Sequence, residues 1–274
     1  MKKLFVFADV HGFYNELKNA LDKAGFDIQN PDHIIISLGD ACDRGPDATK
    51  VLNFINNIPK DRKICIIGNH ELLMESMIAR GDSSIYDITN GTINTAEQLT
   101  CITGHPSAAI YDMKSNSQWN TYKKFWQWYF EVGNYIFVHG WIPCATYSKW
   151  GTLLGLEYNA DWRNASSKKW EDATWVNGMD CWAKGIREPN KTIFCGHWHT
   201  SYGHANLHHY GVEFLNKIET YHFDEELQRE VPFADYGPFI DEGIVALDAC
   251  TVVSHFVNVY TIEIEDNIWE EVTM

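Results

Sequence analysis

The chain has 274 residues and contains no pair of cysteines in a C-x-x-C arrangement, and its seven cysteines are an odd number. A disulfide framework would use an even set of cysteines at regular spacings, so a disulfide-stabilised fold is disfavoured. Cys65 and Cys195 lie in apolar runs, as expected of buried thiols. This cysteine usage is typical of a protein kept in a reducing compartment.

Long apolar runs and basic residues are also scarce. Only five apolar residues separate Lys3 from Asp9, too few for a signal peptide or a membrane span. We therefore expect a cytoplasmic protein with no membrane partner. The 22 basic residues are outnumbered by 37 acidic ones, and the resulting net charge of −15 repels phosphate backbones and disfavours nucleic-acid partners. Bound metal cations would reverse the field locally, so phosphate chemistry stays open.

The chain has no repeat, low-complexity tract or long linker, which predicts one domain over residues 1–274. Up to about residue 80, strand-like runs alternate with segments of helical spacing, an order typical of a layered α/β core with a largely parallel sheet. Residues 82–133 break this rhythm, and we interpret them as a helical insertion. An aromatic helical stripe is predicted there at Tyr122, Phe125, Trp126 and Tyr129.

Five strand-like runs each end at residues that can bind a metal. The runs are Leu4–Ala8, Ile34–Leu38, Ile64–Ile67, Tyr135–Val138 and Thr192–Cys195. The candidate ligands that follow them are Asp9, His11, Asp40, Asn69, His139, His197 and His199. In an open α/β sheet, ligands bind just outside the carboxyl ends of the strands. Mixed carboxylate, imidazole and amide ligands suit Mn, Fe or Zn. The pattern therefore predicts a metal site of the two-metal hydrolytic kind.

The ordered motifs at these strand ends resemble those of the calcineurin-like metallophosphoesterase superfamily. They are Asp9-Val10-His11, Gly39-Asp40-Ala41-Cys42-Asp43-Arg44-Gly45, Gly68-Asn69-His70-Glu71, Val138-His139-Gly140 and Gly196-His197-Trp198-His199. The GDxxDRG and GNHE forms are similar to those of PPP-type serine/threonine protein phosphatases, especially the bacterial and phage branch. One motif alone is a weak signal, whereas the full ordered set is a strong one. The resemblance implies a four-layer α/β/β/α sandwich of two mixed sheets.

The resemblance also implies a division of labour among the ligands of two divalent ions. Asp9 and His11 would hold the first ion, and Asp40 would bridge both. The second ion would be completed by Asn69, His139 and His197. Two ions sharing a bridging water would bring its pKa toward ~7, which gives a hydroxide that attacks phosphorus directly at neutral pH.

Loop residues would carry out the phosphate chemistry. Arg44 can present a forked guanidinium to phosphate, and His70 would stand beside the leaving group, oriented by Asp43. Arg163 is the best match to the family's second phosphate-binding arginine, with Arg187 a weaker candidate. Structural alternatives are a turn salt bridge for Asp43 and Arg44, a helix cap for His70 and a solvated surface position for Arg163.

Two positions depart from the PPP pattern. PPP-type phosphatases usually lack a histidine two places after the GH histidine, whereas the wider superfamily has one that ligates the first metal. We therefore expect His199 to be an additional ligand, the alternative being a histidine outside the ligand set. Cys42 stands where the family often has a bulky apolar residue. It either packs in the core or, if it is accessible near the cations, is sensitive to oxidation.

Together these features predict a dinuclear-metal-dependent phosphatase of phosphomonoesters, with phosphoserine or phosphothreonine in proteins as the leading substrate. The second possibility is a dinucleoside polyphosphate hydrolase like the bacterial diadenosine tetraphosphatases, because Trp198 matches their GHW form. Aromatic residues within 141–182 could then stack a base. A non-catalytic, metal-stabilised scaffold is the third, although the complete ligand set with His70 and Arg44 argues against it. The expected partner is a phosphoprotein or small phosphoester; the native metal and oligomeric state are left open.

Overall fold

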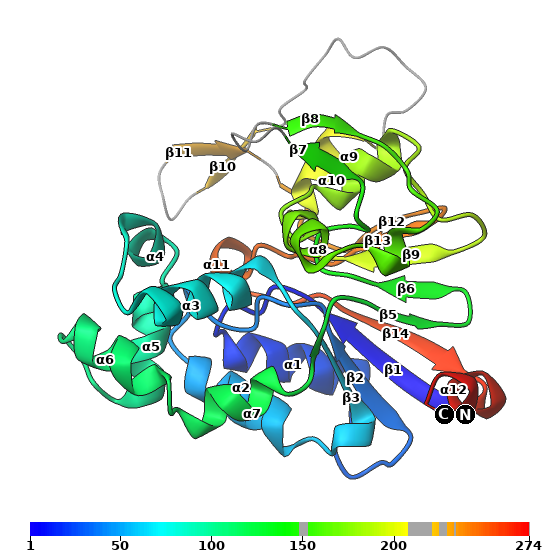
Figure 1. Cartoon of the computed structure of the whole chain (residues 1–274). Coiled ribbons are helices and arrows are strands. Elements are labelled where there is room, and N and C mark those ends of the chain that lie inside the picture. Colours follow the sequence, from blue (N-terminus) through cyan, green and yellow to red (C-terminus); the bar gives the residue numbers. More distant parts are fainter. Residues whose placement is uncertain (148–152, 208–220, 225–228, 233, 274) are drawn as a thin grey trace.

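Two five-stranded sheets face each other in the computed structural model, and helices cover their outer faces (Figure 1). The structure describes residues 1–147, 153–207, 221–224, 229–232 and 234–273. The two ends of the described chain lie close together, and the N-terminal ammonium of Met1 is 2.8 Å from the Asp266 carboxylate.

The first sheet is built around the N-terminal strand. Its strands, in spatial order, are β14 (Val259–Ile264), β1 (Lys2–Phe7), β2 (His33–Ser37), β3 (Lys63–Ile66) and β4 (Trp126–Gln127). The strands from β1 to β4 are parallel, and β14 runs antiparallel to β1. The register pairs Phe7 with Ser37 and Ser37 with Cys65. The loops after β1, β2 and β3 therefore leave the sheet at one edge.

The second sheet has a parallel centre and antiparallel borders. Its strands, in spatial order, are β12 (Phe239–Asp241), β13 (Ile244–Ala246), β9 (Thr192–Cys195), β6 (Tyr135–Phe137) and β5 (Phe130–Val132). The register pairs Phe137 with Phe194 and Ala246 with Cys195. The loops after β6, β9 and β13 consequently also leave at a common edge, as the parallel arrangement requires.

Alternating side chains divide the core into layers. In β1, Leu4 and Val6 pack between the sheets with Phe194 of the facing sheet, whereas Phe5 and Phe7 pack against helices. This follows from strand geometry, because residues two apart point to the same face. The same alternation in β9 divides its side chains between the intersheet core and a third core beneath the outer helices. The predicted four-layer α/β/β/α sandwich is confirmed.

Amphipathic helices form the two outer layers. The helices α1 (Tyr14–Ala24), α2 (Ala48–Asn57) and α3 (Asn69–Arg80) lie on the first sheet, and α8 (Ser167–Ala173), α9 (Gly178–Ala183) and α10 (Ser201–Asn206) lie on the second. In α1, Leu17 and Leu21 are fully buried at a spacing of four residues, which places both on one face of the helix. The helix ends at Gly25, whose φ of 83° is left-handed.

The segment 82–133 contributes helices and strands. Its helices are α4 (Ile85–Thr89), α5 (Thr92–Thr100), α6 (Pro106–Met113) and α7 (Ser117–Lys123). The predicted aromatic helical stripe is wrong beyond Lys123, because Trp126 lies in β4 and the chain then enters β5. Trp126 packs edge-on against Trp119 and Tyr122 at ring separations of 5.3 and 5.5 Å. The rings therefore cluster as they would on one face of a helix, although the chain turns from α7 into β4 between them. A single domain with an insertion here stays a prediction.

Smaller elements complete the described chain. They are the hairpins β7 (Ala145–Tyr147) with β8 (Leu153–Leu156) and β10 (Tyr221–Asp224) with β11 (Arg229–Pro232), the helices α11 (Thr251–Ser254) and α12 (Asp266–Thr273), and the 3-10 turns η1 (Lys60–Arg62) and η2 (Trp162–Asn164). Among the described residues, no helix has the length and apolar character needed to cross a membrane.

Candidate metal centre

The loops at the carboxyl ends of both sheets have unusual backbone geometry. Of the ten described non-glycine residues with positive φ, six are predicted site residues: Asp9, His11, Asp40, Asp43, Arg44 and His197. Left-handed conformations are uncommon for such residues and cost about 1–3 kcal/mol each. They persist where the surrounding structure holds them, and they concentrate at functional sites. The strained backbone conformations therefore lie at the carboxyl-end edge of the sheets, where the sequence predicts the metal site.

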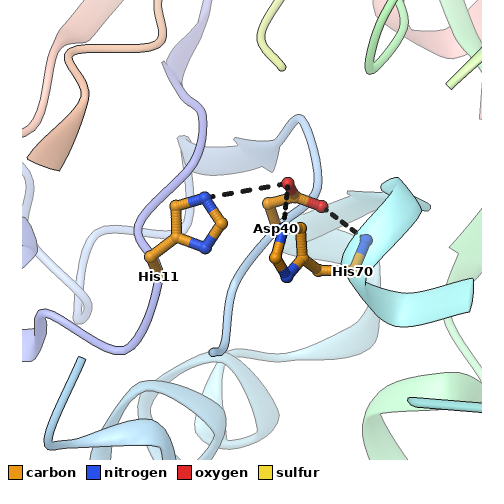
Figure 2. A group of neighbouring side chains, drawn as sticks. All are labelled: His11, Asp40 and His70. Atoms are coloured by element: carbon orange, nitrogen blue, oxygen red, sulfur yellow. Dashed lines mark hydrogen bonds and ion pairs between the residues drawn. The ribbon is translucent and has the colours of Figure 1, made fainter. Parts of the chain in front are cut away.

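Asp40 lies at the centre of the cluster. Its Oδ2 is 3.8 Å from His11 Nε2 and 3.9 Å from His70 Nε2, and its Oδ1 is 3.5 Å from His139 Nε2. Figure 2 shows the side chains of His11 and His70 turned toward this carboxylate, and Oδ1 also accepts the His70 backbone N–H at 3.0 Å. Burial alone would raise the pKa of Asp40, but the surrounding imidazoles, led by His139, lower it below its usual range. The Asp40 carboxylate thus faces imidazoles on two sides, each a candidate metal ligand.

Asn69, His139 and His197 form the second side of the cluster. His139 Nδ1 donates to the Leu38 carbonyl at 2.7 Å, while Nε2 lies 2.8 Å from Asn69 Oδ1. A neutral ring that donates from Nδ1 has an acceptor at Nε2, so two acceptors then face each other, and a shared cation satisfies both. Burial, then His139, lowers the pKa of His197 to about 3. The ring is therefore in the neutral form that binds metals.

Asp9 supplies the test of whether a cation fits here. Its Oδ2 accepts the His197 backbone N–H at 2.9 Å, but its Oδ1 is buried with no hydrogen-bond partner. Burial, followed by the nearby carboxylates of Asp248 and Asp40, raises the pKa of Asp9 well above its usual value. An orphaned buried carboxylate oxygen is costly, and a bound cation removes that cost. Two groups, His11–Asp40–His70 and Asp40–His139–His197, bring their donor atoms within 4.8 Å of one another. The donor set therefore fits divalent metal ions.

His70 has a carboxylate partner behind it. Its Nδ1 donates to Asp43 Oδ2 at 2.7 Å, and burial, which would lower the pKa of His70, is outweighed by Asp40 and Asp43, which raise it. Two hydroxyls of α5 hold Asp43 in turn. Thr92 Oγ1 donates to Oδ2 at 2.8 Å and Thr95 Oγ1 to Oδ1 at 2.7 Å. The ring is thereby oriented and biased toward the protonated form that a general acid needs.

Arg44 stands at the exposed mouth of the cluster. Its Nη1 lies 2.8 Å from His11 Nε2 and its Nη2 lies 3.0 Å from His70 Nε2. The guanidinium can only donate, so His11 Nε2 and His70 Nε2 accept in this arrangement, which holds His70 neutral. The protonated form of His70 that Asp40 and Asp43 favour would break its bond to Arg44. A planar fork facing the cluster from the solvent side is suited to bidentate contact with phosphate oxygens.

Arg163 has a different environment. Its guanidinium forms a bidentate pair with Glu131 at 2.8 and 2.9 Å and a further bond to Glu188 at 3.0 Å. It also lies 4.2 Å from the Trp162 ring centroid. The described contacts of Arg163 thus link β5, which contains Glu131, to the loop before β9, which contains Glu188. They include none of the metal-ligand candidates. Its role in binding phosphate stays a prediction, and the weaker candidate Arg187 lies against Trp182.

His199 and Cys42 are the two departures from the family pattern. His199 is exposed, and its Nδ1 lies 2.7 Å from Ser201 Oγ. It is outside both groups of clustered donors, although it lies close enough to Asp248 to lower the pKa of that carboxyl, and its ligation stays a prediction. Cys42 is buried, and burial followed by Asp43 raises the pKa of its thiol well above the usual value. A buried protonated thiol is inert, which favours the packing role over oxidation sensitivity.

Sequence reasoning gave no role to one buried carboxylate, Glu71 of the GNHE motif, and missed a second, Asp248. Glu71 accepts the backbone N–H groups of Asp40, Ala41 and Gly68 at 2.9, 3.0 and 2.8 Å, which ties the loops after β2 and β3 to the start of α3. Asp248 is buried, and burial raises its pKa to about 6. Its sequence signal was available, because it follows β13 by two residues in the same strand-end position as the predicted ligands.

Two partly exposed tryptophan rings lie next to His197. The Trp175 ring stands edge-on to His197 at 5.8 Å, and the Trp198 ring is 6.5 Å away. Each tryptophan is 39% exposed. Other tryptophans within 141–182 are buried and serve packing: Trp141, Trp162, Trp170 and Trp182. Trp150 lies outside the described residues.

Comparison with known proteins places this geometry in context. The family profile described as calcineurin-like phosphoesterase matches residues 2–238. A symmetrical bis(5'-nucleosyl)-tetraphosphatase of Wigglesworthia glossinidia brevipalpis is 36% identical over 76 residues, 28% of this chain and 27% of that protein. A zinc-dependent endopolyphosphatase of Saccharomyces cerevisiae is 42% identical over 76 residues, 27% of this chain and 22% of that protein. The chain thus spans about a quarter of the length of the curated relatives it matches.

Solved structures are similar at lower sequence identity. The crystal structure of a cold-active protein-tyrosine phosphatase of a psychrophilic Shewanella species aligns with a TM-score of 0.48 and 14% identity. That alignment covers 96% of this chain and 76% of the Shewanella chain.

Proposed function

Because the chain belongs to the calcineurin-like phosphoesterase family, we propose that it is a two-metal phosphohydrolase whose substrate is a dinucleoside polyphosphate. The family resemblance read from the motifs is confirmed, and so is the phosphoester-hydrolase class. The cofactors of this family are two divalent metal ions, as predicted from the ligand types. The substrate and the roles of individual residues are the content of the proposal.

The observation that carries the proposed chemistry is the arrangement around Asp40. We assign Asp9, His11 and Asp40 to the first ion. The second ion is assigned to Asp40, Asn69, His139 and His197. When bound, two such ions neutralise charge on the phosphate and lower the pKa of a water toward ~7, which supplies a nucleophile at neutral pH. His199 is not needed in this assignment, and we propose it as an optional ligand from the exposed side.

The remaining steps belong to side chains of the chain itself. Arg44 binds the non-bridging oxygens of the scissile phosphate, because its fork faces the cluster from solvent. His70 gives its proton to the leaving oxygen, and Asp43, 2.7 Å from Nδ1, keeps the ring in place and supports its charged form. Phosphorus is attacked directly by water, so no covalent phosphoenzyme forms.

Two observations support the dinucleoside polyphosphate over the phosphoprotein that the sequence first suggested. The curated relatives reported above are named for cleaving chains of phosphates, and one is a bis(5'-nucleosyl)-tetraphosphatase. Trp198, the GHW residue, is 39% exposed beside His197, where a base or ribose attached to the phosphates could contact it. Hydrolysis of phosphoserine or phosphothreonine is the second candidate, and the PPP-like motifs GDxxDRG and GNHE favour it.

The substrate proposal is tested by kcat/KM measured in parallel with added Mn on three compounds. These are diadenosine tetraphosphate, a phosphoserine peptide and p-nitrophenyl phosphate. We expect p-nitrophenyl phosphate, which has a good leaving group, and diadenosine tetraphosphate to be hydrolysed. The kcat/KM on diadenosine tetraphosphate should exceed that on the phosphoserine peptide. A preference for the phosphopeptide would reverse the order of the two candidates, and inactivity on all three would support the non-catalytic scaffold.

A further inference from the structure

Two exposed aromatic rings from distant parts of the chain meet beside the candidate metal centre. Tyr86 belongs to α4 and is 48% exposed, and Trp175 follows α8 and is 39% exposed. Their ring centroids are 6.3 Å apart, with the planes inclined at 36°. Trp175 also stands edge-on to His197 at 5.8 Å. The pair thus lies one side chain away from a proposed metal ligand.

Tyr86 and Trp175 are not buried in the hydrophobic core, unlike the neighbouring tryptophans. Trp170 and Trp182, which flank Trp175 in the sequence, are 3% and 5% exposed. α4 leaves Ile85 and Ile88 exposed as well, at 74% and 56%. Large apolar side chains gathered on the surface beside a catalytic centre are characteristic of a binding site.

The structure holds the backbone beneath both rings in place. Asp87 accepts the Ser84 backbone N–H at 2.7 Å and the Ser84 hydroxyl at 2.6 Å, and Asn90 N–H donates to the Tyr86 carbonyl at 3.0 Å. On the other side, Trp175 N–H donates to the Asp172 carbonyl at 3.2 Å. A surface that is ordered before the ligand arrives loses less entropy on binding.

We propose that Tyr86 and Trp175 form a stacking platform for one nucleobase of the substrate, while its phosphates occupy the metal centre. This specificity role rests on the proposed dinucleoside polyphosphate hydrolase function. Both rings are partly exposed, and a planar base can stack on the aromatic surface that they leave open. Stacking contacts the flat face of a base and not the hydrogen-bonding groups on its edge, so the platform accepts different bases.

The platform is tested by equilibrium binding, measured by calorimetry on the Mn-loaded protein. The nucleotide probe is a methylene-bridged, non-hydrolysable analogue of diadenosine tetraphosphate, and the base-free probe is inorganic tetraphosphate. Removing one stacking ring by Tyr86→Ala is expected to raise the Kd of the analogue about 5- to 150-fold, and to leave the Kd of tetraphosphate unchanged. Trp175→Ala is expected to act in the same direction on the analogue, and Tyr86→Phe to retain wild-type binding.

Tyr111→Ala is the matched control, because Tyr111 is an exposed tyrosine (74%) on another helix of the same segment, α6. An unchanged analogue Kd in Tyr86→Ala would overturn the platform, and so would an equal rise for both probes, which indicates a disturbed centre. Failure of the proposed function is recognised separately, because wild-type protein would then hydrolyse no dinucleoside polyphosphate. A wild-type protein that hydrolyses it but binds the analogue no more tightly than tetraphosphate would overturn the platform alone.

Discussion

At the scale of single residues, the centre depends on a few carboxylates that are buried without a matching cation from the protein. Asp40 is balanced by imidazoles on both sides, but Asp9 has an oxygen with no donor and a neighbour of like charge in Asp248. Burying such groups is expensive unless a partner compensates. Arg44 is the guanidinium that contacts the cluster, and it lies on the solvent side. This imbalance is the physical reason to place metal ions at the site.

The first prediction concerns the proton donor. His70→Asn and Asp43→Asn are expected to lower kcat by about 10²–10⁴-fold, because each removes part of the general acid. The loss is expected to be larger on an alkyl phosphate than on p-nitrophenyl phosphate, whose leaving group needs less protonation. Steady-state kinetics with both substrates measure this difference. His105→Asn, at an exposed histidine before α6, is the control and should behave as wild type. Equal losses on the two substrates would remove His70 from the role of acid.

The second prediction concerns the hydroxyls that hold Asp43. Thr92→Val and Thr95→Val each delete one hydrogen bond to a charged group, worth ~1.5–3 kcal/mol. If that energy keeps Asp43 behind His70, kcat falls by about 10- to 150-fold while KM changes little. Thr100→Val is the matched control in the same helix, since its hydroxyl donates to the Ala96 carbonyl at 2.8 Å. An activity loss in the control as large as that in Thr92→Val would point to damage of α5 rather than to positioning.

At the scale of elements, the site is formed by loops from two sheets that approach closely. Gly196, between β9 and His197, shows how close, because a Cβ at this position would collide with Asp9 Oδ2. The third prediction is that Gly196→Ala displaces Asp9 and lowers the bound-metal stoichiometry, measured by atomic emission after dialysis. Gly155→Ala is the control, because a Cβ there meets nothing within 4 Å. Full metal content in Gly196→Ala would show that the two loops can separate without loss of the site.

The same scale explains what the sequence could predict. The five predicted strands agree with the structure within two residues at each end, because apolar runs followed by polar ligands leave little freedom in register. Asp9 and His139 were therefore predicted from local pattern alone. Thr92 and Thr95 were not, since their hydroxyls reach a carboxylate 49 and 52 residues away. No local pattern specifies such a contact; it depends on how α5 packs against the loop after β2.

The failure at Tyr122–Trp126 has a related cause. Aromatic residues three and four apart fit a helix, but α7 ends at Lys123 and Trp126 pairs with Cys65 in the first sheet. Pairing with β3 made Trp126 part of a strand, and the helical spacing of the aromatic residues arose across the turn from α7 to β4. Asp248 is the opposite case, because its strand-end position could have been read from the sequence and was overlooked.

At the scale of the whole molecule, metal binding is expected to contribute to stability. The fourth prediction is that a chelator lowers Tm by several degrees, because an ion at 100 times its Kd stabilises the native state by ~2.7 kcal/mol. Without ions, Asp9, Asp40 and Asp248 repel one another inside the protein. Calorimetric melting before and after EDTA, followed by restoration with excess Mn, measures the effect. Asp9→Asn should melt with a smaller response to EDTA than wild type. An unchanged Tm on chelation would contradict the assignment of buried carboxylates to metal ions.

The central claim is that water attacks phosphorus directly at this centre, with no covalent intermediate on the protein. A single turnover of diadenosine tetraphosphate by excess Mn-loaded protein in ¹⁸O-labelled water tests it, with mass spectrometry of the products. The account predicts one solvent oxygen incorporated per bond cleaved, and no phosphorylated protein at any time. Water that hydrolyses a phosphoenzyme would also enter the product, so the decisive measurement is on the protein: a phosphoenzyme trapped by rapid quenching would contradict the account.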